Sequence, residues 1–313
     1  MFSIEKEFKK LIDFFKILLT KYINQIEGEK MFPKIINNEQ YEFWNKGIGQ
    51  KWVSEDSAMN ERFTVLTNEF FKRTKINKNE KVLDIGCGGG ITSFEASKLV
   101  GENGYVLGAD ISQILLDLAE KNYSNIQNLE FKYCDVQNYE FKKNVFNKVI
   151  SRFGVMFFEN PIDAFKNIHN SIEDGGSLHF MCWTNVMENE FFTASANIII
   201  KFLNKDFPAV TRAPGPFAFS EEEYIKQILI ETDFRNIKVE KFYSEIVTND
   251  PPTKDGNLLF NIGLAGRLLS EENLSEEKLS IIKNEIIEMS QKRQKNGKIS
   301  YKACLNYVSA NKK

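Results

Sequence analysis

Histidine is scarce in this chain, whose 313 residues include two, His169 and His179. Few side chains can therefore shuttle a proton near neutral pH, which disfavours a reaction that depends on a histidine base. His169 lies in a stretch with helical spacing, and we expect it at the surface or as a helix cap; His179 lies within a strand-like run, and we expect it to be a hydrogen-bonded residue of the sheet.

Cysteine is also sparse and scattered. Cys87, Cys134, Cys182 and Cys304 are far apart, and no CxxC pair occurs. This spacing favours reduced thiols in a cytoplasmic protein and argues against a structural zinc site. We therefore expect no metal.

The chain has neither a large charge imbalance nor a long apolar run at its start. A formal net charge of −2 gives no reason to expect a nucleic-acid partner. Asp13 and Lys16 interrupt the apolar N-terminal stretch, which is too short and too charged to span a bilayer. Its helical spacing predicts a helix that packs on its own protein, on a second copy or on a partner; the alternative is a membrane-surface helix.

From residue 81 onward, strand-like and helix-like segments alternate. The expected strands are 81–86, 105–111, 129–136, 146–154 and 177–183, and the expected helices are 91–100, 113–122 and 161–172. Strands separated by helices of these lengths predict a parallel sheet covered on both faces.

The flanking regions read differently. Residues 39–74 are predicted to be helical and are rich in aromatic side chains. After residue 186 the expected helices are 187–205, 220–232 (starting at Ser220), 257–269 and 275–293, the expected strands are 236–247 and 299–308, and breaks are expected at 213–219 and 250–256. Helices placed late in an α/β chain predict a cap over the ligand crevice.

A glycine turn joins the first strand to the first helix of this α/β region, in VLDIGCGGGITSFEAS at residues 82–97. Glycine accepts backbone angles and close contacts that a side chain would block. A dinucleotide site requires GxGxxG, and here the third position is Ile91. The pattern present is GxGxG (Gly86, Gly88 and Gly90), with Asp84 two residues ahead.

A second acid stands at the end of the next strand. Asp110 comes 20 residues after Gly90. A carboxylate there can accept hydrogen bonds from both hydroxyls of a ribose, each worth about 1.5–3 kcal/mol.

These elements resemble motif I and its partners in the class I S-adenosylmethionine-dependent methyltransferases. The stretches YEFWNKGIGQKWV, SRFGVMFFENPIDAFKNIHNSIEDGGSLHFMCW and APGPFAF resemble a bacterial branch related to the ubiquinone and menaquinone methyltransferases. The resemblance covers about residues 39 to 313. It implies a Rossmann-like α/β fold with about seven mainly parallel strands, helices on both faces and a helical cap.

The resemblance implies S-adenosyl-L-methionine as cofactor and S-adenosyl-L-homocysteine as product. Asp110 would hold the ribose, Ile111 and Leu115 would wall the adenine, and Asp135 and Val136 would read its amine and ring edge. The implied cofactor-binding residues are Asp84, Gly86, Cys87, Gly88, Gly90, Asp110, Ile111, Leu115, Asp135, Val136 and Ser151.

Four side chains are candidates for positioning a small-molecule acceptor: Tyr41, Trp52, Arg152 and Phe153. Arg152 could pair with a carboxylate or phosphate of the acceptor, or form a structural salt bridge. Tyr41 and Trp52 could cover the sulfonium or pack in the core. An apolar acceptor pocket, or plain core, is expected from Phe191, Phe192, Phe202, Phe207, Phe217 and Phe219.

The expected organisation has four parts. They are an N-terminal helical extension (1–38), a helical lid (39–75), the cofactor-binding α/β core (76–186) and a segment that caps and completes the sheet (187–313). The predicted function is methyl transfer by in-line attack. The alternatives are a nicotinamide-dependent oxidoreductase, which the missing third glycine opposes, and a non-catalytic S-adenosylmethionine-binding regulatory subunit.

Overall fold

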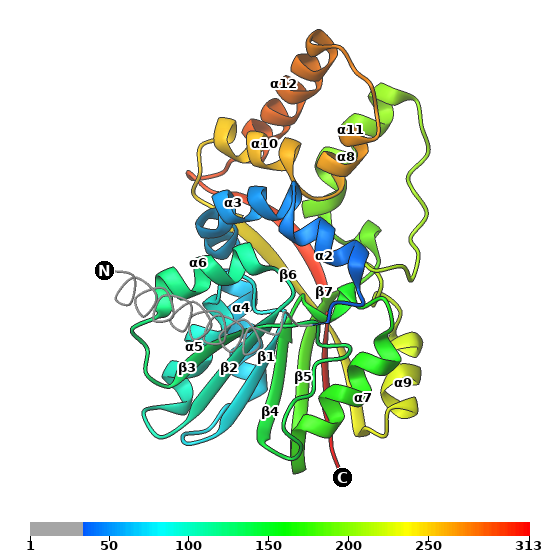
Figure 1. Ribbon diagram of the computed structural model, residues 1–313. Helices are drawn as coiled ribbons and strands as arrows, with labels where there is room; N and C mark the ends of the chain where they lie inside the picture. Colours follow the sequence, from blue (N-terminus) through cyan, green and yellow to red (C-terminus); the bar gives the residue numbers. More distant parts are fainter. Residues whose placement is uncertain (1–33) are drawn as a thin grey trace, which may run out of the picture. The chain divides into compact units, whose positions relative to one another are not determined.

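The computed structural model describes residues 34–313 (Figure 1). The chain divides into two units, Met1–Lys34 and Ile35–Lys313, and the description concerns the second. The predicted N-terminal helix lies outside the described residues.

The second unit is built on a seven-stranded sheet with the order β3-β2-β1-β4-β5-β7-β6. Neighbouring strands are parallel except for β7, which is antiparallel to both β5 and β6. The strands are β1 (Lys81–Ile85), β2 (Tyr105–Asp110), β3 (Leu129–Tyr133), β4 (Phe146–Arg152), β5 (Ile172–Trp183), β6 (Arg235–Thr248) and β7 (Ile299–Asn311). This is the predicted class I methyltransferase fold, and that prediction is confirmed.

The strand order reverses between β1 and β4. Connections run outward from this point in both directions, and right-handed crossovers then put the helices on opposite faces. The crossover helices are α5 (Ile91–Val100), α6 (Gln113–Tyr123) and α7 (Pro161–Ser171), and α9 (Glu222–Glu231) packs on α7 and β6. Ligands of such sheets bind at the carboxyl ends of the strands beside the reversal.

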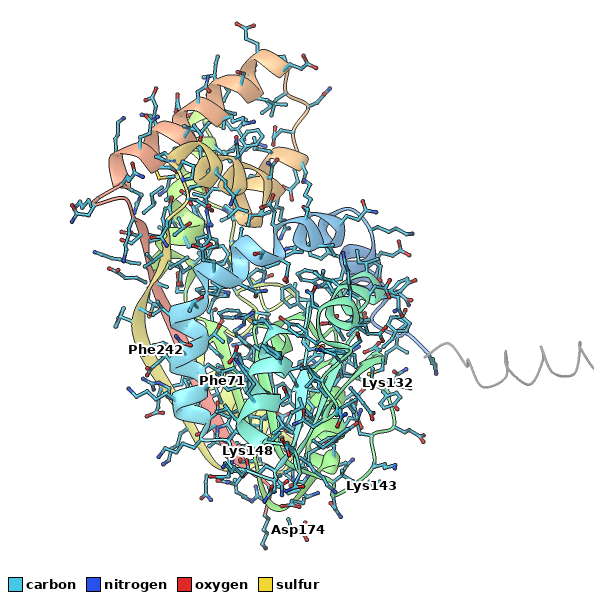
Figure 2. The ribbon with its side chains drawn as sticks, turned by 90° about the vertical axis from the view of Figure 1, so that its left-hand side faces the viewer. Phe71, Lys132, Lys143, Lys148, Asp174 and Phe242 are labelled. Atoms are coloured by element: carbon cyan, nitrogen blue, oxygen red, sulfur yellow. The ribbon has the colours of Figure 1, made fainter. Side chains whose placement is uncertain are left out.

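Two groups of helices lie at the carboxyl ends of the strands (Figure 1). The first group precedes the sheet and consists of α2 (Asn38–Asn45) and α3 (Ile48–Arg62); α4 (Thr64–Thr74) follows α3 and lies along a face of the sheet. The second comprises α8 (Glu190–Leu203), α10 (Pro252–Asn261), α11 (Gly263–Ser270) and α12 (Glu276–Arg293), which pack on one another. In Figure 2 this second group is at the top, and Asp174 marks the opposite end of the sheet.

The last third departs from the predicted elements at three points. Residues 250–256 were expected to be a break, but α10 starts at Pro252, where proline suits the first turn of a helix. The single helix expected over 257–269 is divided at Ile262 and Gly263. The φ of Gly263 is +64°. Ser220 does not cap α9; Glu221 holds the N-cap position and makes no side-chain capping bond.

Helix α4 packs against β4, β5 and β6. Figure 2 shows Phe71 of α4 and Phe242 of β6 on the same side of the molecule, and both pack against the core. The Arg73 guanidinium lies 4.7 Å from the centroid of the Phe242 ring. The packing fixes α4, and through it the end of α3, relative to the sheet.

None of the helices within residues 34–313 combines the length and apolar character needed to cross a membrane.

Candidate cofactor-binding site

The turn between β1 and α5 depends on glycine backbone geometry. Gly86, Gly88 and Gly90 have φ values of +68°, +55° and +87°, in the region that side chains disfavour. A Cβ on Gly86 would lie 2.6 Å from the Cα of Gly154. The turn therefore lets the backbone at the end of β1 lie against the backbone that follows β4.

Asp84, the acid ahead of the turn, is fully buried at the end of β1. Its Oδ2 accepts hydrogen bonds from Thr92 Oγ1 and Ser93 Oγ in the first turn of α5, both at 2.6 Å. Its Oδ1 is buried and has no partner among the described residues. Burial raises the pKa of Asp84 to about 6, because the charged form is incompletely solvated.

Cys87 lies within the glycine turn and is 5% exposed. Its backbone N–H donates to the carbonyl of Ala109 at 3.2 Å. Burial, and then the nearby charge of Asp110, raises the pKa of the thiol well above its ordinary value. The thiol is therefore protonated and suits a packing role beside the ligand.

Asp110, at the end of β2, is tied to the glycine turn. Its Oδ2 accepts from the backbone N–H of Gly88 and its Oδ1 from that of Ser112, each at 2.8 Å. Burial raises its pKa, while these backbone bonds act in the opposite direction. Each carboxylate oxygen still has lone-pair capacity for a further donor.

Helix α2 is fastened over the end of β2, beside the predicted adenine walls. The Asn45 side chain donates to the carbonyl of Ile111 at 2.9 Å and accepts from the backbone N–H of Gln113 at 2.8 Å. Ser112 Oγ donates to the carbonyl of Trp44 at 2.8 Å. Leu115, in the first turn of α6, is 6% exposed.

Asp135, beyond the end of β3, holds the segment that leads into α2. Its Oδ2 accepts from the backbone N–H groups of Ile36 and Asn37 at 3.0 and 2.9 Å, and its Oδ1 from that of Gln137 at 3.0 Å. Val136, the next residue, is 5% exposed. We call residues 36–45 the strap, since they cross from the end of β3 to the end of β2.

Ser151 joins the ends of the two central strands. Its buried hydroxyl donates to the carbonyl of Ile85 at 2.7 Å and accepts from the N–H of Gly154 at 3.2 Å. Both bonds are to backbone groups, so Ser151 fixes the spacing between β1 and β4 beneath the glycine turn.

Arg152, the last residue of β4, faces α3 and α4. Its Nη1 donates to Thr67 Oγ1 at 2.5 Å and its Nη2 to Asn60 Oδ1 at 3.2 Å, and its Nε is buried without a partner among the described residues. Burial lowers the pKa of the guanidinium to about 10, so it stays charged at neutral pH. The nearby acids, Asp84 and Asp56, act in the opposite direction.

Phe153 begins a cluster of aromatic rings. Its φ of +70° is unusual for a bulky residue, and its ring stacks on Trp183 with centroids 4.6 Å apart. Phe63 lies against Phe153 at 5.5 Å, and the Arg152 guanidinium lies 5.8 Å from the Phe63 ring centroid. The cluster consists of Phe63, Phe153, Trp183, Phe191, Phe192 and Phe217.

Tyr41 and Trp52 are placed in different surroundings. Tyr41, on the strap, contacts Tyr133 at the end of β3; burial and this contact raise the pKa of Tyr133 to about 12. Trp52, on α3, packs edgewise on Trp44 with centroids 5.9 Å apart. Tyr41 is therefore at the predicted adenine end of the site.

Two features of the site have no motif in the sequence. Asp56, in the middle of α3, lies so close to Gly89 that a Cβ on that glycine would be 2.5 Å from Asp56 Oδ1. The strap contacts of Asn37 and Asn45 are equally unmarked. A single acid or amide in an amphipathic helix resembles any solvated side chain, so no sequence signal could have identified them.

Residues 76–211 match the methyltransferase domain family. The fold and this match define the class: the chain carries a methyltransferase domain of the S-adenosylmethionine-dependent type. The residues present fit this cofactor. Of the residues that the structure describes, none lies within 4 Å of where a Cβ on Gly88 would stand, and none bonds Asp84 Oδ1.

Among curated proteins, the chain is similar to enzymes of quinone biosynthesis. It is 25% identical over 165 residues to the ubiquinone/menaquinone biosynthesis C-methyltransferase UbiE of Wigglesworthia glossinidia brevipalpis, covering 50% of this chain and 61% of that one. It is 25% identical over 223 residues to the demethylmenaquinone methyltransferase of Staphylococcus aureus strain MRSA252, covering 66% of this chain and 89% of that one.

Among solved structures, YcgJ of Bacillus subtilis has a TM-score of 0.52 and 14% identity, covering 79% of this chain and 97% of that one. A Bacillus halodurans C-125 protein described as a methyltransferase has a TM-score of 0.50 and 19% identity, covering 79% and 98%. These two likenesses agree with the fold described above.

Proposed function

We propose that the protein methylates a small, largely apolar acceptor that carries an anionic group, by in-line attack of an acceptor atom. The observation that supports this is Arg152, whose Nε–H is buried next to the aromatic cluster and has no partner within residues 34–313. A guanidinium offers a planar pair of donors to a carboxylate, phosphate or phenolate. The rings beside it would hold an apolar body.

On the cofactor side, S-adenosylmethionine supplies a methyl group already activated on a sulfonium. Asp110 would accept the ribose hydroxyls, while Ile111 and Leu115 would bound the adenine. Asp135 already accepts three backbone N–H groups, and a carboxylate has about four lone-pair sites. One site therefore remains for the amine of the adenine.

The remaining work of the protein is positioning and exclusion of water. Holding two reacting groups in line can supply roughly 7–11 kcal/mol of a barrier. Arg152 would fix the anionic end of the acceptor, and Phe153 and Trp183 would fix its apolar part. The strap and α3 would cover the cofactor.

No strong base is required when the acceptor ionises by itself, and neither histidine is placed to act as one. His179 contacts Tyr307 OH and Ser177 Oγ, and burial lowers its pKa to about 4. His169 packs edgewise on Phe234.

The chemistry of the relatives' named substrates is compatible with this acceptor class. Several of them are named for demethylmenaquinone, whose reduced form has an acidic phenolic hydroxyl and an apolar body. A reduced quinone is therefore the first acceptor to test, together with apolar carboxylates and phosphates.

The test is incubation of the purified protein with methyl-labelled S-adenosylmethionine and this panel, followed by mass spectrometry. We expect label in an apolar compound that carries an anionic group or an ionisable phenol, and none in cationic or non-ionisable analogues of the same size. Label confined to cationic acceptors would contradict the proposal.

The role of Arg152 is tested by Arg152→Lys, which keeps the charge but loses the planar donor pair. We expect kcat/KM to fall at least ten-fold for the anionic acceptor while the affinity for S-adenosylhomocysteine stays within two-fold. Unaltered kinetics would make Arg152 a structural residue.

A further inference from the structure

Helix α3 places a carboxylate directly over the glycine turn. A Cβ on Gly89 would stand 2.5 Å from Asp56 Oδ1 and 3.2 Å from its Oδ2. Gly89 does not have a positive φ, unlike its neighbours Gly88 and Gly90. The Asp56 carboxylate therefore occupies the space beside Gly89, and a side chain at position 89 would displace it.

We propose that Asp56 binds the ammonium group of the cofactor's methionine portion, together with the unpartnered Oδ1 of Asp84. This inference rests on the proposed cofactor site and adds to it a residue from outside the α/β core. Asp56 would make α3 part of the binding site, closing over the amino-acid end of the ligand.

Hydrogen bonding leaves Asp56 free for this role. Within residues 34–313 its carboxylate accepts one side-chain bond, from Asn60 Nδ2 to Oδ2 at 2.9 Å. Arg152 influences it electrostatically but forms no ion pair with it within 4.0 Å; its guanidinium bonds Asn60 and Thr67. Asp56 Oδ1, the oxygen nearest Gly89, remains available to a donor.

The charges of Asp56, Asp84 and Arg152 favour a bound cation. Asp56 and Asp84 carry two negative charges when ionised, and Arg152 carries one positive charge. Burial raises the pKa of both acids, which means that their ionised forms lack full compensation. An ammonium group placed between them would supply it, and the carboxylate of the ligand would then lie toward the first N–H groups of α5.

The experiment is calorimetry of the whole chain with three ligands that share the adenosine portion. S-Adenosylhomocysteine has both ammonium and carboxylate, its analogue that lacks the α-amino group keeps only the carboxylate, and 5′-methylthioadenosine has neither. We expect Asp56→Asn to weaken S-adenosylhomocysteine binding at least ten-fold and to leave the other two within two-fold.

Glu61→Gln is the matched control, because it removes an exposed acid from the same helix. It should leave all three affinities unchanged. Gly89→Ala should reproduce the Asp56→Asn pattern, since its Cβ would displace the carboxylate. Melting temperatures of the variants report whether each remains folded.

Equal weakening of all three ligands by Asp56→Asn would overturn the inference and leave Asp56 a structural residue. Unchanged binding of all three would also overturn it. Failure of the unsubstituted protein to bind any of them would instead contradict the cofactor site itself. The acceptor proposal is independent, since no acceptor is present.

Discussion

At the scale of single residues, Asp84 and Asp110 are held differently although both end central strands. Asp110 receives backbone N–H bonds on both oxygens. Asp84 accepts two hydroxyl hydrogen bonds on one oxygen, and its other oxygen is buried with no hydrogen-bond partner in the part of the chain that the structure describes. The carboxylate of Asp84 is therefore the one that a bound cation would stabilise more. In the protein without ligand, its ionisation is also the less favourable of the two.

The pKa of Asp84 leads to a prediction on stability. Because its pKa in the folded protein is about 6 and its ordinary value is 3.8, the folded state holds the proton more tightly than the unfolded state. Protonated Asp84 therefore stabilises the folded state. This stabilisation is complete below about pH 4 and is lost as the pH rises through 6. We expect the free energy of unfolding of the wild type to fall by about 2 kcal/mol relative to Asp84→Asn between pH 4 and pH 7.

Urea unfolding of both proteins across this range measures the difference, and titrations common to the two cancel. A difference that does not change with pH would show that Asp84 is ionised throughout.

For Asp110 we expect a loss of ligand affinity. Asp110→Ala removes the proposed ribose acceptor and leaves the N–H groups of Gly88 and Ser112 without a partner. S-Adenosylhomocysteine should bind at least ten-fold more weakly in calorimetry. Asp117→Ala, at an exposed position of α6, is the control and should bind normally. Equal affinity in the two variants would exclude the ribose role.

At the scale of elements, the strap is fastened by few contacts, so its attachment can be tested by one substitution. Asn45→Ala deletes the two bonds that its side chain makes with the segment after β2 and leaves the bond from Ser112 to the carbonyl of Trp44. We expect faster amide hydrogen exchange over residues 38–45 and faster release of S-adenosylhomocysteine, by about five-fold or more.

Asn38→Ala is the matched control on the same helix, because its exposed side chain makes one long bond, at 3.4 Å to the carbonyl of Ile36. If Asn45→Ala and Asn38→Ala exchange and release alike, the strap is not held at the end of β2.

The strands and crossover helices could be predicted because burial imposes a regular pattern on them. The ends of elements could not always be predicted. Pro251, Pro252 and Gly256 indicate a break, yet the segment continues as a helix because proline fits its first turn and Gly256 allows Ile287 of α12 to approach closely. At Gly256 a Cβ would lie 2.7 Å from the Ile287 side chain.

The candidate site likewise has a part that the sequence predicts and a part that it does not. The turn, Asp84 and Asp110 are identified by spacing along one α/β unit. Asp56 and the strap contacts depend on where helices that precede the sheet are packed. Such contacts link residues far apart in the chain, so no local pattern marks them.

At the scale of the whole unit, a buried ion network joins α3 to the helices after β6. Arg62 is 1% exposed; its Nη1 donates to Asp250 at 2.7 Å and its Nη2 to Asp255 at 2.9 Å. Asp255 also accepts from Ser290 of α12 and Tyr301 of β7. The helix that carries Asp56 is thereby fixed to α10, α12 and β7.

Removing one partner of this network should be costly. Arg62→Met leaves the fully buried Asp255 without its cation, and we expect a loss of about 3–5 kcal/mol in the free energy of unfolding. Arg267→Met removes an exposed partner of Glu271 and should change it by less than about 0.5 kcal/mol. Urea unfolding compares them, and similar small losses would show that the buried network contributes little.

The hold of Asp135 on the strap comes from main-chain groups at positions 36 and 37. Every residue type except proline carries such a donor. These two hydrogen bonds therefore do not depend on which side chain stands at position 36, and they permit substitution there. Proline at position 36 or 37 would remove one of them and weaken the attachment of the strap.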